Sequence, residues 1–140
     1  MSLKMTADEI SAYLDEVFPQ VAGHFQIEAL DEMRIRVRLN VSDAHLRPGG
    51  TVSGPSIFAL TDCAVYMAVL AMVGPKALAV TTSSSIDFMR KPAANTDLIA
   101  DCRLLKLGRV LAVGDVLVFS DGDDRPVARA SLTYSIPPKD

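Results

Sequence analysis

One carboxylate stands alone in the most apolar stretch of this sequence. Between Arg47 and Lys76 the chain carries a single charged residue, Asp62, which follows Gly54 by eight positions. If a helix begins near Gly54, its first backbone N–H groups carry partial positive charge and can stabilise an oxyanion that develops on an acyl carbonyl. A carboxylate among apolar side chains is a stronger base than one in water. Together the two groups suit acyl transfer, in which one polarises a carbonyl and the other attacks it or activates water.

Local signals predict that Gly54 and Asp62 lie on the same long helix. Ser53 or Gly54 can cap its start, Pro55 is tolerated in its first turn, and Gly74-Pro75 ends it. At about 1.5 Å of rise per residue, Gly54 and Asp62 are roughly 12 Å apart along the axis. They cannot both reach one carbonyl from the same helix. If both act, two antiparallel helices from two subunits must share each site, and catalysis requires a dimer.

This helix is apolar on nearly every side, which indicates either a buried helix or a membrane span. The stretch is at the lower end of the roughly 20 residues that a span needs. Asp62 near its middle would cost about 2.5–3.5 kcal/mol on insertion, and no partner span is visible elsewhere in the sequence. We therefore expect a buried helix in a soluble domain and no membrane partner.

Composition indicates one ordinary domain. The chain has 140 residues and a net charge of −3, with 22% charged residues and no basic cluster, which argues against a nucleic-acid partner. Cys63 and Cys102 both lie in apolar segments, as expected for reduced core residues of a cytoplasmic protein. The two His and two Cys lack ligand spacing, so we expect no metal. The N-terminus lacks a secretory signal; we expect residues 1–20 to hold a leader and a short helix, and residues 21–140 to form a single domain.

The flanking segments predict an α+β fold. A capping box at Thr6–Glu9 begins a short amphipathic helix that ends near Phe18-Pro19. Apolar residues alternate with arginines over 33–40, which favours a strand with one solvated face over a phosphate site. Phe25 and Ile27 suggest a strand that turns at Asp31-Glu32, and further strands are expected over 77–90, 98–105, 110–119 and 127–136. One curved antiparallel sheet must wrap the apolar helix, and a second subunit can cover the exposed edge of that sheet.

The sequence resembles a known family. The element order, the SGPSIFALTD stretch at 53–62, the FMRKPA segment at 88–93 and the KLGR turn at 106–109 resemble the hotdog-fold acyl-CoA thioesterases of the phenylacetate-pathway type. The resemblance covers nearly the whole chain from about Val21 onward. It implies a hotdog fold and hydrolysis of a small or medium acyl-CoA. It also implies that no cofactor is needed beyond the coenzyme A of the substrate, and that the protein is a homodimer or a dimer of dimers.

The resemblance also assigns roles to single residues. Asp62 matches the catalytic acid of the family, Gly54 matches the glycine whose N–H polarises the thioester carbonyl, and Thr81 matches the Ser or Thr that positions water. Thr81 could instead belong to a solvated sheet face. Four basic residues lie in segments that contact the nucleotide and phosphates of coenzyme A in related proteins: Arg90, Lys91, Lys106 and Arg109.

The sequence departs from the family pattern at three positions, all placed among the substrate-binding candidates. The family His is Ser53, the second Gly is Pro55, and an upstream Asn is Arg47. Pro55 removes one backbone donor, so an oxyanion hole would rest on Gly54, with Ser56 as a possible second donor. Arg47 places a cation where an anionic acyl group could be bound.

Alternatives remain open at this stage. Asp62 could be structural, and Cys63 is interpreted as a core residue rather than a nucleophile. His45 is expected to be a solvated loop residue and His24 a residue at the edge of a strand. A non-catalytic acyl-CoA-binding hotdog protein is the first rival to the enzyme. A hotdog dehydratase or hydratase is the second, although its chemistry usually needs a His near the helix start.

Overall fold

The computed structural model describes residues 2–138 and has two helices, two short 3-10 turns and six strands in this range. This confirms the predicted α+β class. The elements are α1 (Ala7–Val17), η1 (Pro19–Val21), β1 (Phe25–Asp31), β2 (Arg34–Leu39), η2 (Asp43–His45), α2 (Gly54–Val73), β3 (Val80–Phe88), β4 (Leu98–Leu107), β5 (Leu111–Ser120) and β6 (Pro126–Ser135).

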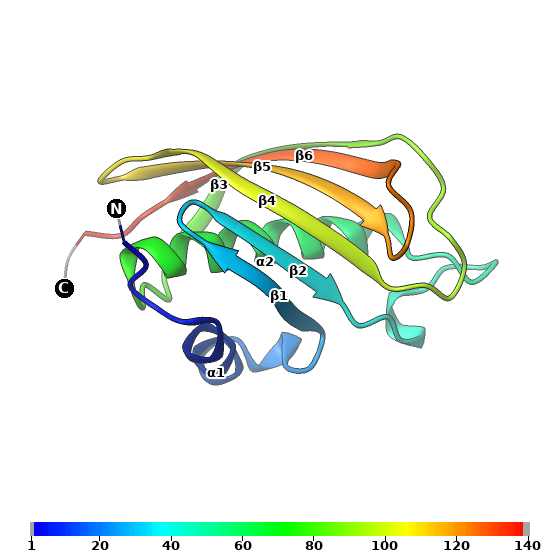
Figure 1. Cartoon of the computed structure of the whole chain (residues 1–140), viewed down its shortest axis with the longest axis horizontal. Coiled ribbons are helices and arrows are strands. Elements are labelled where there is room, and N and C mark those ends of the chain that lie inside the picture. Colours follow the sequence, from blue (N-terminus) through cyan, green and yellow to red (C-terminus); the bar gives the residue numbers. More distant parts are fainter. Residues whose placement is uncertain (1, 139–140) are drawn as a thin grey trace.

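The six strands form one antiparallel sheet in the order β1-β2-β4-β5-β6-β3. The sheet curves around α2, which crosses its concave side, and α1 lies beside β1 (Figure 1). β3 follows the helix in sequence but pairs at the far edge of the sheet, next to β6. Its outer edge is unpaired, and both of its ends are exposed, with Val80 and Phe88 each 54% accessible. An exposed strand edge of this kind is a template for pairing with another chain.

The core forms around α2. Thirteen of its residues are buried, and Leu60, Val65 and Leu70 are wholly inaccessible. The helix is long and apolar enough to cross a membrane by composition, but most of it is buried inside the protein. This confirms the expectation of a buried helix.

Close packing of α2 on the sheet depends on one glycine. A Cβ at Gly114 of β5 would lie 2.8 Å from Cγ2 of Val65 and 3.0 Å from its Cγ1. Any larger residue would push the helix off the strand at this point.

The first helix belongs to the same core. Glu9 N–H donates to Thr6 Oγ1 (3.2 Å) and Thr6 N–H donates to Glu9 Oε1 (2.9 Å), which confirms the predicted capping box. Ile10 and Leu14 are buried in the cluster that surrounds α2.

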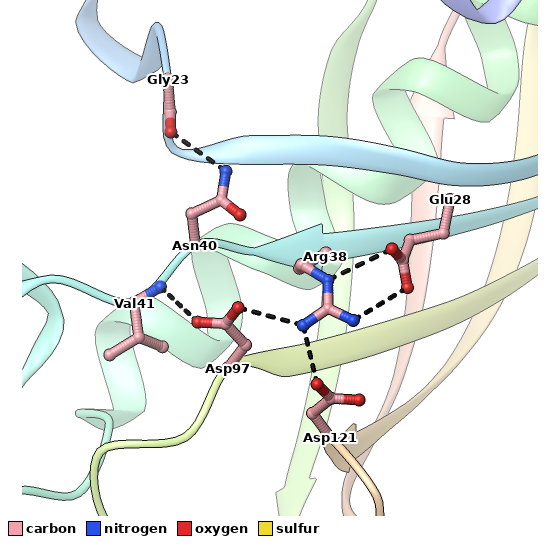
Figure 2. Close-up of polar contacts among 7 residues, drawn as sticks. All are labelled: Gly23, Glu28, Arg38, Asn40, Val41, Asp97 and Asp121. Atoms are coloured by element: carbon pink, nitrogen blue, oxygen red, sulfur yellow. Dashed lines mark hydrogen bonds and ion pairs between the residues drawn. The ribbon is translucent and has the colours of Figure 1, made fainter.

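The arginines of β2 point to the outer face of the sheet. The Arg38 guanidinium donates to Glu28 of β1, to Asp97 just before β4 and to Asp121 just after β5 (Figure 2). These hydrogen bonds raise the pKa of Arg38 further, so it stays charged. Four carboxylate contacts occupy this arginine, which agrees with a strand face rather than a phosphate site.

Most strand boundaries differ from the prediction by a few residues. Met33 has a positive φ of 61° and belongs to the β1–β2 turn rather than to β2. The strand predicted over 77–90 is shorter, because residues 74–79 form the connection from α2 and β3 begins at Val80.

Candidate active site

Asp62 lies on the second turn of helix beyond Gly54 and is only half-buried. Its Oδ1 accepts a hydrogen bond from Thr81 Oγ1 (2.5 Å) and another from the Tyr134 hydroxyl (2.9 Å). The Tyr134 oxygen also lies 3.1 Å from the Asp62 carbonyl oxygen. In the described part of the chain, Oδ2 has no hydrogen-bond donor. The two hydroxyls therefore hold the carboxylate by Oδ1, and Oδ2 remains available to a ligand.

Strand pairing brings the two hydroxyls together. Thr81 of β3 and Tyr134 of β6 are direct partners in the antiparallel ladder, and β6 turns Leu132 and Tyr134 inward on the same face. Burial, followed by the nearby Asp62 charge, raises the pKa of Tyr134. Its hydroxyl therefore keeps its proton and acts as a donor to the carboxylate.

The surroundings of Asp62 differ from the purely apolar setting expected from the sequence. Two hydroxyl groups face the carboxylate, and only one of them, that of Thr81, was anticipated. Tyr134 was missed, although the alternation over 127–136 predicts that it faces the helix. A polar residue at an inward position of an otherwise apolar strand is the signal that could have found it.

A cleft of about 220 Å³ opens beside Asp62. We call it the aspartate pocket. Apart from Asp62 its walls are apolar side chains, hydroxyls and one thiol, contributed by the end of α1, by α2, by the 74–79 connection and by β3 and β6. The lining residues are Val17, Phe18, Asp62, Cys63, Tyr66, Ala77, Ala79, Val80, Thr81 and Tyr134.

Cys63 lies in this wall but is not poised for attack. Burial, with a smaller contribution from Asp62, raises the pKa of Cys63 to about 12. The thiolate is the nucleophilic form, and almost none is present at neutral pH. The structure thus agrees with a core role for this cysteine.

The start of α2 offers one free backbone donor. Ser53 is the N-cap, as predicted, and its hydroxyl accepts from Ser56 N–H (3.4 Å). Pro55 has no N–H to give. Gly54 N–H is the first of the helix, and no hydrogen bond within residues 2–138 uses it. Ser56, the possible second oxyanion donor, has its N–H directed at the cap in this structure.

Gly54 also sits where a side chain would meet an aromatic ring. A Cβ at this position would lie 3.4 Å from Cζ of Phe88. The N-terminus of α2 thus lies under the end of β3, whereas Asp62 lies under its beginning at Thr81.

A histidine pair supports the loop that leads into α2. His45 is 6% exposed, so the expectation of a solvated loop residue was wrong. Its Nδ1 accepts from Ser42 N–H (3.0 Å), which leaves the proton on Nε2, 3.4 Å from Nδ1 of His24. His24 is half-buried by the same contact rather than free at a strand edge. The His45 carbonyl accepts from Ser53 N–H (2.8 Å), so the pair fixes the residue that caps the helix.

A second cleft, of about 420 Å³, opens at Gly54. We call it the glycine pocket. It gathers three of the predicted binding cations, and it shares no lining residue with the aspartate pocket. The lining residues are Arg47, Thr51, Val52, Gly54, Ile57, Phe88, Met89, Arg90, Lys91 and Pro92.

Two predicted binding residues lie elsewhere. Lys106 and Arg109 are exposed at the β4–β5 turn and line neither pocket. This turn is at the end of the sheet where β3 begins, because Leu111 and Val80 both pair with Ser135 of β6. Within one chain these two cations are therefore nearer to the Asp62 end than to Gly54.

A single long helix wrapped by a curved antiparallel sheet is the hotdog architecture, and comparison of the sequence with known families agrees with it. The model of the thioesterase superfamily matches residues 49–127. The chain belongs to the thioesterase superfamily. No curated protein matches it by sequence.

Three solved structures illustrate the range of similarity. A candidate thioesterase from Silicibacter sp. TM1040 is 62% identical over 99% of this chain and 96% of that one, with a TM-score of 0.93. A Streptococcus mutans UA159 protein bound to acetyl-CoA is 27% identical over 82% and 90% of the two chains, with a TM-score of 0.72. A mutant of the phenylacetic acid degradation protein PaaI from Thermus thermophilus is 28% identical over 85% and 99%, with a TM-score of 0.72.

Proposed function

We propose that this protein is an acyl-CoA thioesterase of the phenylacetate-pathway type, which hydrolyses the thioester of a small or medium acyl-CoA. One observation carries the proposal: Oδ1 of Asp62 is held by two hydroxyls while Oδ2 is left without a donor at a pocket wall. Family membership and the likeness to the Thermus thermophilus protein support it.

Asp62 is the proposed catalytic acid. It either removes a proton from a water that attacks the thioester carbonyl, or attacks that carbonyl itself to form an anhydride that water then hydrolyses. In both routes the C–S bond breaks, and the leaving thiolate takes up the proton that the attacking water gives up. The products are the free carboxylic acid and the thiol of coenzyme A. Thr81 and Tyr134 position Asp62, and Gly54 N–H stabilises the oxyanion.

The two routes can be separated by isotope. In a single turnover in H₂¹⁸O, ¹⁸O that enters the Asp62 carboxylate would identify direct attack, because only hydrolysis of an anhydride at the aspartyl carbon labels that side chain. Activation of water places it in the released acid.

The cations are proposed to bind the phosphates of coenzyme A. Arg47, Arg90 and Lys91 converge on the glycine pocket beside Gly54, and a guanidinium is suited to bidentate contact with a phosphate. The acetyl-CoA in the Streptococcus mutans protein supports a coenzyme A ester as the ligand class. Ser53 and Pro55 shape this site mainly through the geometry of the helix start.

The active form is proposed to be a homodimer, alone or paired into a tetramer. Thr81 marks the Asp62 end of β3 and Phe88 marks the Gly54 end. If two β3 edges pair antiparallel about a twofold axis between Ser84 and Ser85, Thr81 lies opposite Phe88 of the partner subunit. Asp62 then meets Gly54 of the partner subunit, as the distance along one helix requires.

This pairing would also bring Lys106 and Arg109 close to a coenzyme A site. They sit at the end of the sheet where β3 begins, which in the proposed dimer adjoins the glycine pocket of the partner. Each coenzyme A would then be met by cations of both subunits.

A second candidate function is non-catalytic binding of an acyl-CoA. The observation that favours it is the start of α2, where Ser53 replaces the family His and the Ser56 N–H is consumed by the cap. Only Gly54 is left to stabilise an oxyanion. A hydratase is disfavoured, because His45 is paired with His24 and neither lines either pocket.

A panel of acyl-CoA esters with detection of the released thiol tests the proposal. We expect thiol release by the wild-type protein and at least a hundredfold slower release by Asp62→Asn, since general-base catalysis alone contributes about 10²–10⁴-fold. Asp124→Asn, which changes an exposed carboxylate in the β5–β6 turn, is the matched control. Tight binding of the esters without thiol release would favour the non-catalytic alternative.

We also propose a cytoplasmic location, which cell fractionation can test. Cys63 and Cys102 are both buried and unpaired. Free thiols of this kind fit a reducing compartment.

A further inference from the structure

The two pockets of one chain have opposite chemical character. The glycine pocket carries three cations, whereas the aspartate pocket has no cation and a single anion, Asp62. A substrate that is anionic at one end only would place that end in the glycine pocket. The aspartate pocket is left for the other end.

The hydroxyl protons in the aspartate pocket are already used in hydrogen bonds. The Tyr66 hydroxyl donates to the Ala77 carbonyl (2.9 Å), and the ring stacks near that of Tyr134 with centroids 6.0 Å apart. Thr81 and Tyr134 both donate to Asp62. No hydroxyl proton is left to donate to a polar group of a ligand. Apart from Asp62 and the hydroxyl oxygens, the side chains that line the pocket are Val17, Phe18, Ala77, Ala79 and Val80, which are apolar, and Cys63.

One wall of the aspartate pocket comes from outside the helix and the strands that hold Asp62. Val17 and Phe18, at the end of α1, line the pocket together with Ala77 and Ala79 of the connection between α2 and β3. Phe18 also packs against the core. The position of α1 therefore limits how far the pocket extends from the carboxylate.

We propose that the aspartate pocket binds the acyl group of the substrate, that this group is neutral and apolar, and that Phe18 sets its maximum length. The inference rests on the proposed function, since it names the acyl class for the same site. An apolar cavity of about 150 Å³ accommodates benzene, and this pocket measures about 220 Å³. It thus has room for about six to nine carbons, either an aryl group with a short spacer or a straight chain of similar bulk.

Charge excludes the dicarboxylic acyl groups. A second carboxylate on the acyl chain would lose water and face Asp62 with no cation in the pocket wall. Arg47, considered from the sequence as a partner for an anionic acyl group, lies with Arg90 and Lys91 at the glycine pocket and is assigned to the phosphates.

S-alkyl thioethers of coenzyme A test the pocket without turnover, because they lack the carbonyl. Their affinity for the wild-type protein, measured by calorimetry, should rise about fourfold per methylene while the chain is buried. It should stop rising near eight carbons. An S-carboxyalkyl thioether of equal length should bind at least tenfold more weakly.

Two variants should move the length limit in opposite directions. Phe18→Ala lengthens the pocket, so the limit should rise by two or more carbons. Ala77→Leu fills it without removing any packing, so the limit should fall even if the first variant loosens α1. Leu117→Ala, on the outer face of β5, lines neither pocket and should leave the profile unchanged.

The outcomes separate this inference from the proposed function. A chain-length profile in thioether binding without hydrolysis of any acyl-CoA would overturn the proposed activity and leave the pocket assignment standing. Three results would overturn the assignment, whatever the hydrolysis assay shows. They are an affinity that does not change with chain length, equal binding of the carboxyalkyl compound, and a length limit that is the same in both variants as in the wild type.

Discussion

The Tyr134 hydroxyl offers the sharpest test of how Asp62 is positioned. Tyr134→Phe removes one of the two donors to Oδ1 and leaves the ring in the core. A hydrogen bond to a charged group contributes about 1.5–3 kcal/mol, and each 1.36 kcal/mol of barrier is about tenfold in rate. If that interaction holds the carboxylate in its reactive orientation, kcat should fall by about 10- to 150-fold.

The other donor gives the matching half of a double-mutant cycle. Thr81→Val should also lower kcat, and the two effects should not add, because both hydroxyls bind the same oxygen. KM should change less than kcat in either variant, since both substitutions keep the shape of the aspartate pocket and neither residue lines the cation-lined glycine pocket. Thr82→Val, the exposed neighbour that bonds only to the Thr133 carbonyl, is the control.

Steady-state hydrolysis of one good acyl-CoA substrate, with circular dichroism to confirm folding, is sufficient for this cycle. If folded Tyr134→Phe and Thr81→Val variants, alone and combined, all retain kcat within about twofold of wild type, the hydroxyls do not position the catalytic carboxylate.

Three further predictions concern other parts of the molecule. Burial, followed by the nearby His24, lowers the pKa of His45 below 6.5, so the native state binds fewer protons than the unfolded chain. The free energy of unfolding should therefore fall as pH drops below about 6.5. His45→Asn, which keeps an acceptor for Ser42 N–H, should flatten this dependence in urea titrations. Gly114→Ala should destabilise the fold by about 1–3 kcal/mol in thermal melts, and Val65→Ala in the same chain should recover part of the loss. Neutralising the three cations of the glycine pocket should raise KM for coenzyme A esters, most strongly at low salt, and leave KM for short pantetheine esters unchanged. Equal effects on the two ester types would show that these residues are surface charges that do not bind the phosphates.

Local signals in the sequence were sufficient for the central helix. Ser53, Pro55 and Gly74 act within one or two turns, so the cap and the end of α2 could be placed from residue types alone. The alternation in β2 likewise separated its buried and solvated faces, because the side-chain period of a strand is local.

The missed features all depend on contacts between distant segments. Tyr134 reaches Asp62 only because β6 pairs with β3, which is set by the sheet order rather than by neighbouring residues. His45 is buried by His24, 21 residues away in sequence. Phe18 joins the aspartate pocket because α1 folds back onto α2. The alternation of β6 predicts that Tyr134 faces inward, but the partner in each of these three contacts lies on another element and cannot be predicted from one element alone.

Mixed dimers test whether each active site is divided between two subunits. Asp62→Asn removes the carboxylate, and Gly54→Val places a side chain against Phe88 at the oxyanion donor. Each variant alone should be inactive. In a mixed dimer, one site inherits both defects and the other is wild type.

Co-expression of the two variants should therefore restore up to about a quarter of wild-type activity for random pairing and independent sites. Circular dichroism, sizing and native mass measurements verify that both variants fold and that mixed dimers form. Activity well above that of either parent is the predicted result. Verified mixed dimers with no activity beyond the parents would contradict a site shared between Asp62 of one subunit and Gly54 of the other.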